Sequence, residues 1–232
     1  MQFWNGKRKA VTFSYDDGVR QDKRLAEIFN KYGLKATFNI NAGQMYDGCV
    51  WNCRGVDVVR MTIPECKAAL AGHEIACHSL THVDLPALDG YQLERQIAGD
   101  KALLEYIFGQ PVNGMAYPGG GFSPEVEAVL AKLGLRYART IRQTEAFDLS
   151  PNFLELDATA HHKNPRLLEL ADQFLALEPD RPQLFYLWGH SYEFDCDQNW
   201  EVIEEFCCRI SGREDIFYGT NHQVLSPFYP AE

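Results

Sequence analysis

The sequence lacks several features that would place it in whole classes of protein. No apolar run approaches the roughly 20 residues that a membrane-spanning helix needs, so we expect no membrane span. Basic residues are in the minority, with 22 Lys and Arg against 32 Asp and Glu, which gives a net charge of −10. This balance argues against a nucleic-acid groove or an anionic membrane as partner, because both require a basic face. We find no internal repeat, low-complexity tract or linker.

The start of the chain also lacks the apolar core of an export signal. The seven cysteines are an odd number at irregular spacings, which favours a reduced, cytoplasmic compartment over a disulfide framework. A signal that was trimmed away is also compatible with these observations. Cys49 and Cys53 form a C-x3-C pair without a second pair, so we expect two free thiols or a disulfide rather than a zinc site. The sequence does not indicate the oligomeric state.

The sequence does contain a regular alternation of short apolar runs and amphipathic segments. Strands are predicted at residues 10–14, 35–40, 74–77, 114–117, 135–140, 153–157, 183–188 and 216–219. Helices are predicted between them, beginning with residues 19–32, and capping signals stand at Thr62-Ile63-Pro64-Glu65 and Ser123-Pro124. Strands that alternate with helices form parallel sheets. Seven or eight such units predict a single α/β domain over residues 1–232, a distorted (β/α) barrel of seven to eight mostly parallel strands.

One segment does not fit this alternation. Residues 43–60 are predicted to be a long irregular loop, and loops of this length often cover a functional site. The loop contains Trp51, which is suited either to stacking on the face of a sugar or to packing the loop down.

Polar side chains follow nearly every predicted strand. Because the active sites of parallel barrels form at the carboxyl ends of their strands, we expect these side chains to lie together. The first strand ends in Asp16, Asp17 and Gly18, and the third is followed by His78 and His82, four residues apart. One aspartate and two histidines would leave a coordination position open, as catalytic metal sites do. Nitrogen and oxygen ligands suit zinc first, with cobalt, nickel or manganese as alternatives.

The remaining parts of a hydrolytic site are also available. A water activated by a metal needs a base, for which the other aspartate of the first strand is suited. A backbone N–H in Pro118-Gly119-Gly120 could stabilise an oxyanion, and His190, after the seventh strand, could serve as the acid.

The motifs T-F-S-Y-D-D-G, H-S-L-T-H and W-G-H resemble those of the polysaccharide deacetylase family, which is carbohydrate esterase family 4 or the NodB-homology domain. The resemblance covers residues 11–220, in the expected order. It implies a distorted (β/α) barrel and a divalent metal, usually zinc. It also implies hydrolytic removal of acetyl groups from N-acetyl sugars or, less often, acetylated xylan, so the expected partner is an acetylated carbohydrate.

The resemblance also implies individual roles. By position, the general base is Asp16, the metal ligands are Asp17, His78 and His82, the backbone oxyanion donor is Gly119, and the acid is His190.

Two departures from the family pattern stand out. Ala116 replaces the arginine that normally steadies the base, and we hypothesise that Arg139, one strand later, reaches the same place. The fourth motif, which holds the partner of the acid, is not clear. The candidate partners and further site residues are Asp157, Glu193, Asp195, His161, His162 and Trp188.

Two other functions are compatible with the sequence. The missing arginine and the unclear fourth motif would suit a catalytically silent carbohydrate-binding relative. Related sequences also include amidases that act on small, non-peptide C–N substrates.

Overall fold

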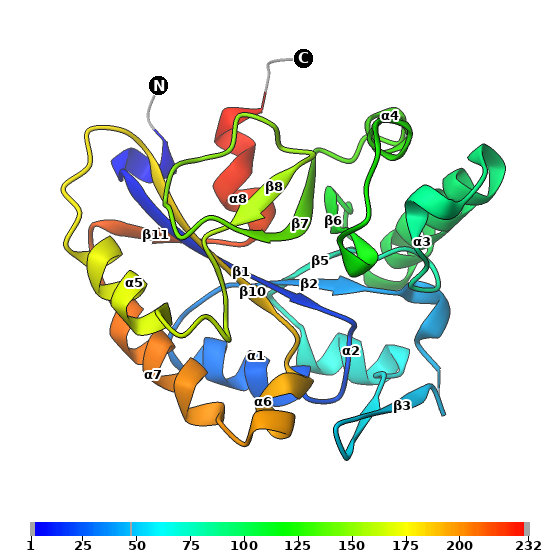
Figure 1. The fold of residues 1–232 in the computed structure, drawn as a ribbon, viewed down its shortest axis with the longest axis horizontal. Helices are drawn as coiled ribbons and strands as arrows, with labels where there is room; N and C mark the ends of the chain where they lie inside the picture. Colours follow the sequence, from blue (N-terminus) through cyan, green and yellow to red (C-terminus); the bar gives the residue numbers. More distant parts are fainter. Residues whose placement is uncertain (1–2, 47, 230–232) are drawn as a thin grey trace.

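The structure is a computed structural model that describes residues 3–46 and 48–229 (Figure 1). Its strands are β1 (Lys9–Asp16), β2 (Thr37–Ile40), β3 (Val50–Cys53), β4 (Val56–Val59), β5 (Glu74–Cys77), β6 (Gly114–Ala116), β7 (Tyr137–Gln143), β8 (Leu156–Ala158), β9 (Ala160–His161), β10 (Gln183–Gly189) and β11 (Ile216–Tyr218). Its α-helices are α1 (Asp22–Lys31), α2 (Ile63–Ala69), α3 (Gly90–Phe108), α4 (Pro124–Lys132), α5 (Leu167–Leu175), α6 (Tyr192–Asp197), α7 (Trp200–Ile210) and α8 (Asn221–Leu225).

The main sheet closes on itself. Its strands pair in the order β8-β7-β6-β5-β2-β1-β10-β9, and all of these pairs are parallel. Because β8 and β9 are consecutive pieces of one segment, the pairing of β8 with β7 and of β9 with β10 joins the two edges. Strand β11 pairs with the first residues of β1, whereas β2 pairs with the last residues of β1. The predicted distorted barrel of mostly parallel strands is confirmed.

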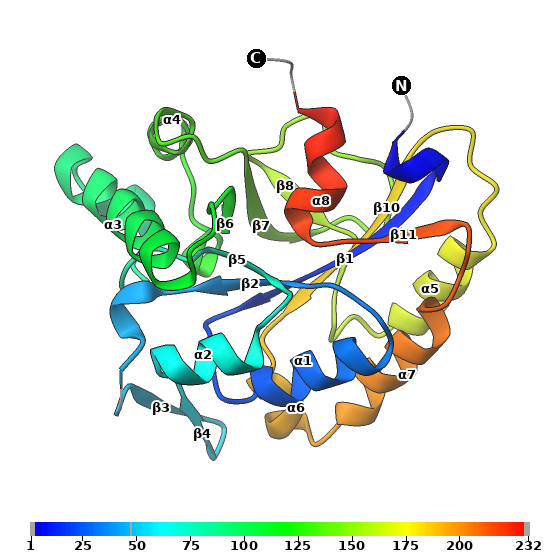
Figure 2. The same cartoon turned by 180° about the vertical axis from the view of Figure 1, so that it is seen from behind.

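Strands β1 and β10 lie side by side in the barrel wall, and every residue of both is buried. The helices cover the barrel with apolar faces, as α1 does with Leu25, Ile28 and Phe29. Figure 1 shows α5, α7, α1 and α2 along one side of the sheet, and Figure 2 shows α8 on the opposite side. Within the described ranges, no helix has both the length and the apolar character to cross a membrane.

The local signals for the helix ends are largely confirmed. Thr62 and Glu65 form the predicted capping box of α2, and the Ser123 hydroxyl accepts the N–H of Val126 at the start of α4. Gly109 ends α3 in the left-handed conformation, with φ of 66°. The first helix begins at Asp22 rather than at residue 19, because its carboxylate accepts the Val19 N–H in a preceding turn.

The prediction that residues 43–60 form an irregular loop is wrong. Strands β3 and β4 make an antiparallel hairpin, joined by Arg54 and Gly55 at φ of 50° and 89°. Two consecutive positive φ values are typical of the tight turn that matches the twist of a hairpin. The tip is docked, because the Arg54 guanidinium lies 2.6 Å from the Asp197 carboxylate on α6. Cys49 and Cys53 are both free thiols.

The sixth predicted strand is displaced along the sequence. It is expected at residues 153–157, but the structure has β8 at Leu156–Ala158 and β9 directly after it. The reason is a turn at Asn152, whose side-chain oxygen accepts the Leu154 N–H at 3.0 Å and so delays the strand. The short helices α6 and α8 were not predicted.

Candidate active site

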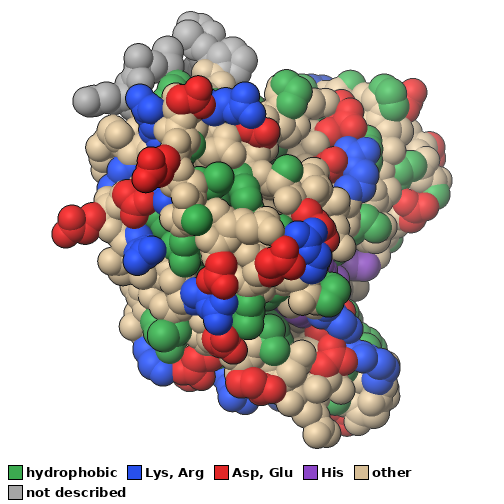
Figure 3. All heavy atoms as spheres, turned by 60° about the vertical axis from the view of Figure 1, so that its left-hand side comes forward, with side chains coloured by type: hydrophobic (Ala, Val, Ile, Leu, Met, Phe, Trp, Pro, Cys, Tyr) green, Lys and Arg blue, Asp and Glu red, His purple; other side chains and the backbone are tan. Residues whose placement is uncertain are grey.

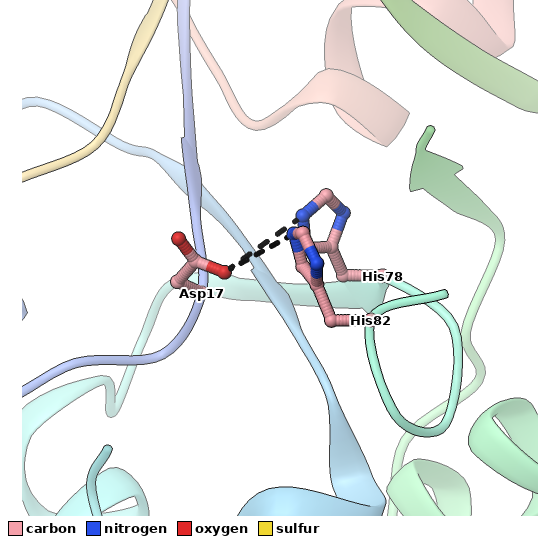
Figure 4. Close-up of side chains that lie close together, drawn as sticks. All are labelled: Asp17, His78 and His82. Carbon is pink, nitrogen blue, oxygen red and sulfur yellow. Dashed lines mark ion pairs between the residues drawn. The ribbon is translucent and has the colours of Figure 1, made fainter. Parts of the chain in front are cut away.

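Three potential metal-binding side chains meet at the carboxyl ends of β1 and β5. Oδ1 of Asp17 lies 4.0 Å from Nε2 of His78 and 3.6 Å from Nε2 of His82, and Figure 4 shows both imidazoles facing this carboxylate. The three ligand atoms all lie within 4.8 Å of one another. The structure therefore brings together the three side chains that the sequence predicted as ligands.

The hydrogen bonds of His78 leave one ring nitrogen available for a cation. Its Nδ1 lies 2.8 Å from the Ala116 carbonyl, which can only accept, so Nδ1 carries the hydrogen. Nε2 then has a free lone pair that faces Asp17, and this buried atom has no hydrogen-bond partner. Burial lowers the pKa of His78 to about 4 despite the nearby carboxylates, which keeps the ring neutral. An orphaned, neutral imidazole nitrogen beside a carboxylate fits a divalent metal.

The backbone at this cluster adopts a costly conformation. Asp17, Ser79 and His82 have φ of 84°, 59° and 56°, in the left-handed region that favours glycine. Each such residue costs on the order of 1–3 kcal/mol and persists only where its surroundings hold it. The two turns that carry the candidate ligands are therefore held in place by the rest of the fold.

Asp16 is paired with a fully buried arginine. Nη2 of Arg139 donates to Oδ1 of Asp16 at 2.6 Å and also to Oδ2, and Nδ2 of Asn39 donates to Oδ1 at 2.8 Å. Burial by itself would raise the pKa of Asp16, but the Arg139 guanidinium, with His78 and His190, lowers it to about 2. Asp16 is thus a carboxylate at neutral pH. Arg139 thus supplies a guanidinium to Asp16 in a chain that has Ala116 where the family pattern has an arginine.

His190 faces both aspartates. Its Nε2 lies 3.9 Å from Oδ2 of Asp16 and 4.0 Å from Oδ2 of Asp17, while its Nδ1 lies 3.5 Å from Oε2 of Glu193 on α6. Burial would lower the pKa of His190, but Glu193 and the two aspartates raise it above its ordinary value. The carboxylates around His190 therefore favour the protonated form of its imidazole.

Glu193 is shared by several imidazoles. Its Oε2 lies 3.1 Å from Nε2 of His161 and 3.2 Å from Nε2 of His162, and Lys163 contributes an ammonium 3.7 Å from Oε1. Burial would raise the pKa of Glu193, but the imidazoles hold it well below its usual range. His161, His190 and Glu193 also have ligand atoms within 4.8 Å of one another.

This second cluster differs from the first in two respects. Nδ1 of His161 accepts the Lys163 N–H at 3.1 Å, so its Nε2, 3.1 Å from Oε2 of Glu193, carries the hydrogen and has no free lone pair. The Lys163 ammonium already provides a cation for the carboxylate.

The other predicted site residues are placed less centrally. Trp188 is buried with its ring 4.3 Å from the Arg139 guanidinium, and Trp51 on β3 packs edge-on against Tyr192. Gly119 lies exposed in the turn after β6, with φ of 60°. Asp157 accepts hydrogen bonds from Thr140 and Arg142, and Asp195 accepts one from Trp200. Of the three candidate partners of His190, Glu193 is the one that faces it.

Sequence reasoning missed two polar residues of the site. Asn39, on β2, holds Asp16 and Ser14, and Arg60, just after β4, contacts Asp17. Asn39 could have been found from its place near the end of a predicted strand, whereas Arg60 lay in the segment expected to be irregular. The space-filling view in Figure 3 shows histidine side chains in a recess of the surface, between groups of acidic and basic residues.

Comparison with known proteins identifies the family. The family model described as polysaccharide deacetylase matches residues 4–138. The Bacillus subtilis (strain 168) protein YxkH, provisionally named a polysaccharide deacetylase, is 26% identical over 133 residues. That alignment covers 57% of this chain and 44% of YxkH, so the match spans less than half of the relative.

Solved structures show the same fold. A Mycobacterium smegmatis protein, provisionally described as a polysaccharide deacetylase, has a TM-score of 0.73 at 16% identity, covering 98% of this chain and 92% of that one. BA3943 of Bacillus anthracis, described as a pseudoenzyme of carbohydrate esterase family 4, has a TM-score of 0.61 at 16% identity. That match covers 94% of this chain and 66% of BA3943.

Proposed function

Because this chain belongs to the polysaccharide deacetylase family, we propose that it is a metal-dependent hydrolase that removes acetyl groups from an acetylated carbohydrate. The observation that carries the proposal is the convergence of Asp17, His78 and His82 on one point beside the Arg139-held Asp16 and His190. Asp17, His78 and His82 would hold a divalent metal, most suitably zinc, with cobalt, nickel or manganese as alternatives. When bound, the metal polarises the acetyl carbonyl and lowers the pKa of water.

The protein's own groups supply the proton transfers. Arg139 holds Asp16 as an oriented carboxylate, and we assign this carboxylate the role of accepting the proton of the attacking water. Nε2 of His190 lies within 4.0 Å of both aspartates, which favour its protonated form, and we assign it the role of donating a proton to the nitrogen or oxygen that leaves the acetyl carbon. Glu193 faces Nδ1 of His190 and stabilises the protonated ring. The backbone N–H of Gly119 is the proposed donor to the oxyanion.

Metal removal tests this proposal directly. We expect a chelator to abolish acetate release from a panel of N- and O-acetylated mono- and oligosaccharides, and added zinc or cobalt to restore it. Small cyclic and linear amides belong in the same panel, because they separate a deacetylase from an amidase. Full acetate release by the metal-free protein would refute metal dependence.

A silent carbohydrate-binding protein is the second candidate. The fold similarity to a protein described as a pseudoenzyme favours it, as does Ala116 in place of the family arginine. Arg139 weakens this argument, since it supplies a guanidinium to Asp16. Sugar binding without acetate release under every metal condition would identify this second function.

A further inference from the structure

Arg60 is a buried cation that the proposed reaction does not use. It lies just after β4 and is 6% exposed. From Nη1 it donates to the backbone carbonyl of Asp17 and, at 2.6 Å, to Oδ1 of Asn41. From Nη2 it donates to Oδ1 of Asp17 at 3.1 Å. One guanidinium therefore holds both the main chain and the carboxylate of a proposed metal ligand.

The main-chain contact falls where the backbone needs support. Asp17 has φ of 84°, a conformation that persists only when its surroundings hold it. Its N–H donates to the Asn39 carbonyl at 3.0 Å, and the next carbonyl, that of Gly18, accepts the Met61 N–H at 2.9 Å. Arg60 and Met61 therefore hold the carbonyls of two consecutive residues, Asp17 and Gly18. Through these contacts, the segment that follows β4 fixes the direction in which the Asp17 side chain points.

The carboxylate contact leaves room for a cation. Oδ1 of Asp17 is also the atom nearest to His78 and His82, at 4.0 and 3.6 Å. A carboxylate oxygen has two acceptor sites, so the single hydrogen bond from Arg60 leaves one acceptor site of this oxygen for a cation. The Trp51 ring lies 5.1 Å from the Arg60 guanidinium and covers it, which strengthens these hydrogen bonds by limiting access of water.

We propose that Arg60 is a positioning residue for the metal centre and that it raises the affinity of the site for a divalent metal by holding Asp17. The inference rests on the proposed function in one respect, since it takes Asp17 as a ligand. Residues that orient a ligand from outside the coordination shell typically change metal affinity about 10–100-fold when they are replaced.

Zinc titration of the metal-free protein, by calorimetry or by competition with a chromophoric chelator, measures this role without an activity assay. We expect Arg60→Met to bind zinc about 10–100-fold more weakly than the wild type. Arg60→Lys should lie between them, because an ammonium keeps the charge but cannot form the two-armed contact. The matched control is Arg54→Met, which removes an arginine of the same hairpin whose partner is Asp197, and its zinc affinity should stay within about twofold.

The outcomes distinguish a residue that positions the metal ligand from one that only stabilises the fold. A purely structural Arg60 would lower the melting temperature of Arg60→Met but leave the zinc affinity of the folded protein unchanged, and that result would overturn the inference. Tighter zinc binding would overturn it as well, since Arg60 would then compete with the metal. If Arg60→Met does not fold, wild-type affinity in Arg60→Lys overturns the inference. A wild type that binds none of zinc, cobalt, nickel and manganese refutes the proposed function, whereas a wild type that binds zinc no more tightly than Arg60→Met refutes this inference alone.

Discussion

Replacing Arg139 by Met tests how the chain compensates for the family arginine that it lacks at Ala116. Arg139 is fully buried and contacts both oxygens of Asp16, and it also donates to the Thr140 carbonyl at 2.9 Å. Removing it leaves a buried carboxylate without its partner, which typically costs 3–5 kcal/mol of stability. Because the proposed base loses its orientation, we also expect turnover to fall by about 10²-fold or more.

Three measurements separate these effects. Urea unfolding reports the stability loss, acetate release reports turnover, and zinc titration reports the metal site, which we expect to keep its affinity. Arg139→Lys keeps the charge in case the Met variant does not fold. Arg209→Met is the control, since this arginine pairs with Asp172 and Glu205 on the covering helices, and its turnover should match the wild type. Wild-type turnover in Arg139→Met would refute the reasoning. A loss of zinc affinity as large as the loss of turnover would refute it as well.

Two further substitutions probe the site and the pH dependence of stability. Glu193→Gln removes the charge that faces His190, so turnover should fall at least tenfold while zinc affinity stays unchanged; weakened zinc binding would contradict this assignment. Burial, with a smaller contribution from Lys35, lowers the pKa of His73 to about 4. The pKa of His73 in the folded protein lies below its value of about 6.5 in the unfolded chain. As the pH falls from 6.5 towards 4, the unfolded chain therefore binds a proton at His73 that the folded protein does not, and stability is lost. The variant His73→Asn keeps an acceptor for the Ala36 N–H and does not titrate. Between pH 7 and pH 4, urea unfolding should therefore show that it loses about 3 kcal/mol less stability than the wild type. Equal losses in the two proteins would contradict this prediction.

Much of the fold was predictable because its signals are local. The apolar runs that become β1 and β10 are continuous, as expected for strands buried on both faces. The hairpin escaped prediction because Arg54 stands where Asn or Asp usually marks a tight turn, and because most of its residues are exposed or half-buried. Helix α6, six residues long, is too short to show a helical period.

The candidate site likewise has a part that was predictable from the sequence and a part that was not. The sequence by itself determined the side chains at the strand ends, Asp16 and Asp17 after one apolar run and His78 and His82 four residues apart after another, since strand ends follow from local pattern and parallel strands place them at one edge.

Only the tertiary structure decided which groups pair with them. Arg139 meets Asp16 across 123 positions of sequence, and Arg60 meets Asp17 across 43. Glu193, rather than Asp157 or Asp195, faces His190 because α6 turns it that way. Such pairings depend on distances between side chains on separate elements, which the periodicity of a single segment does not encode.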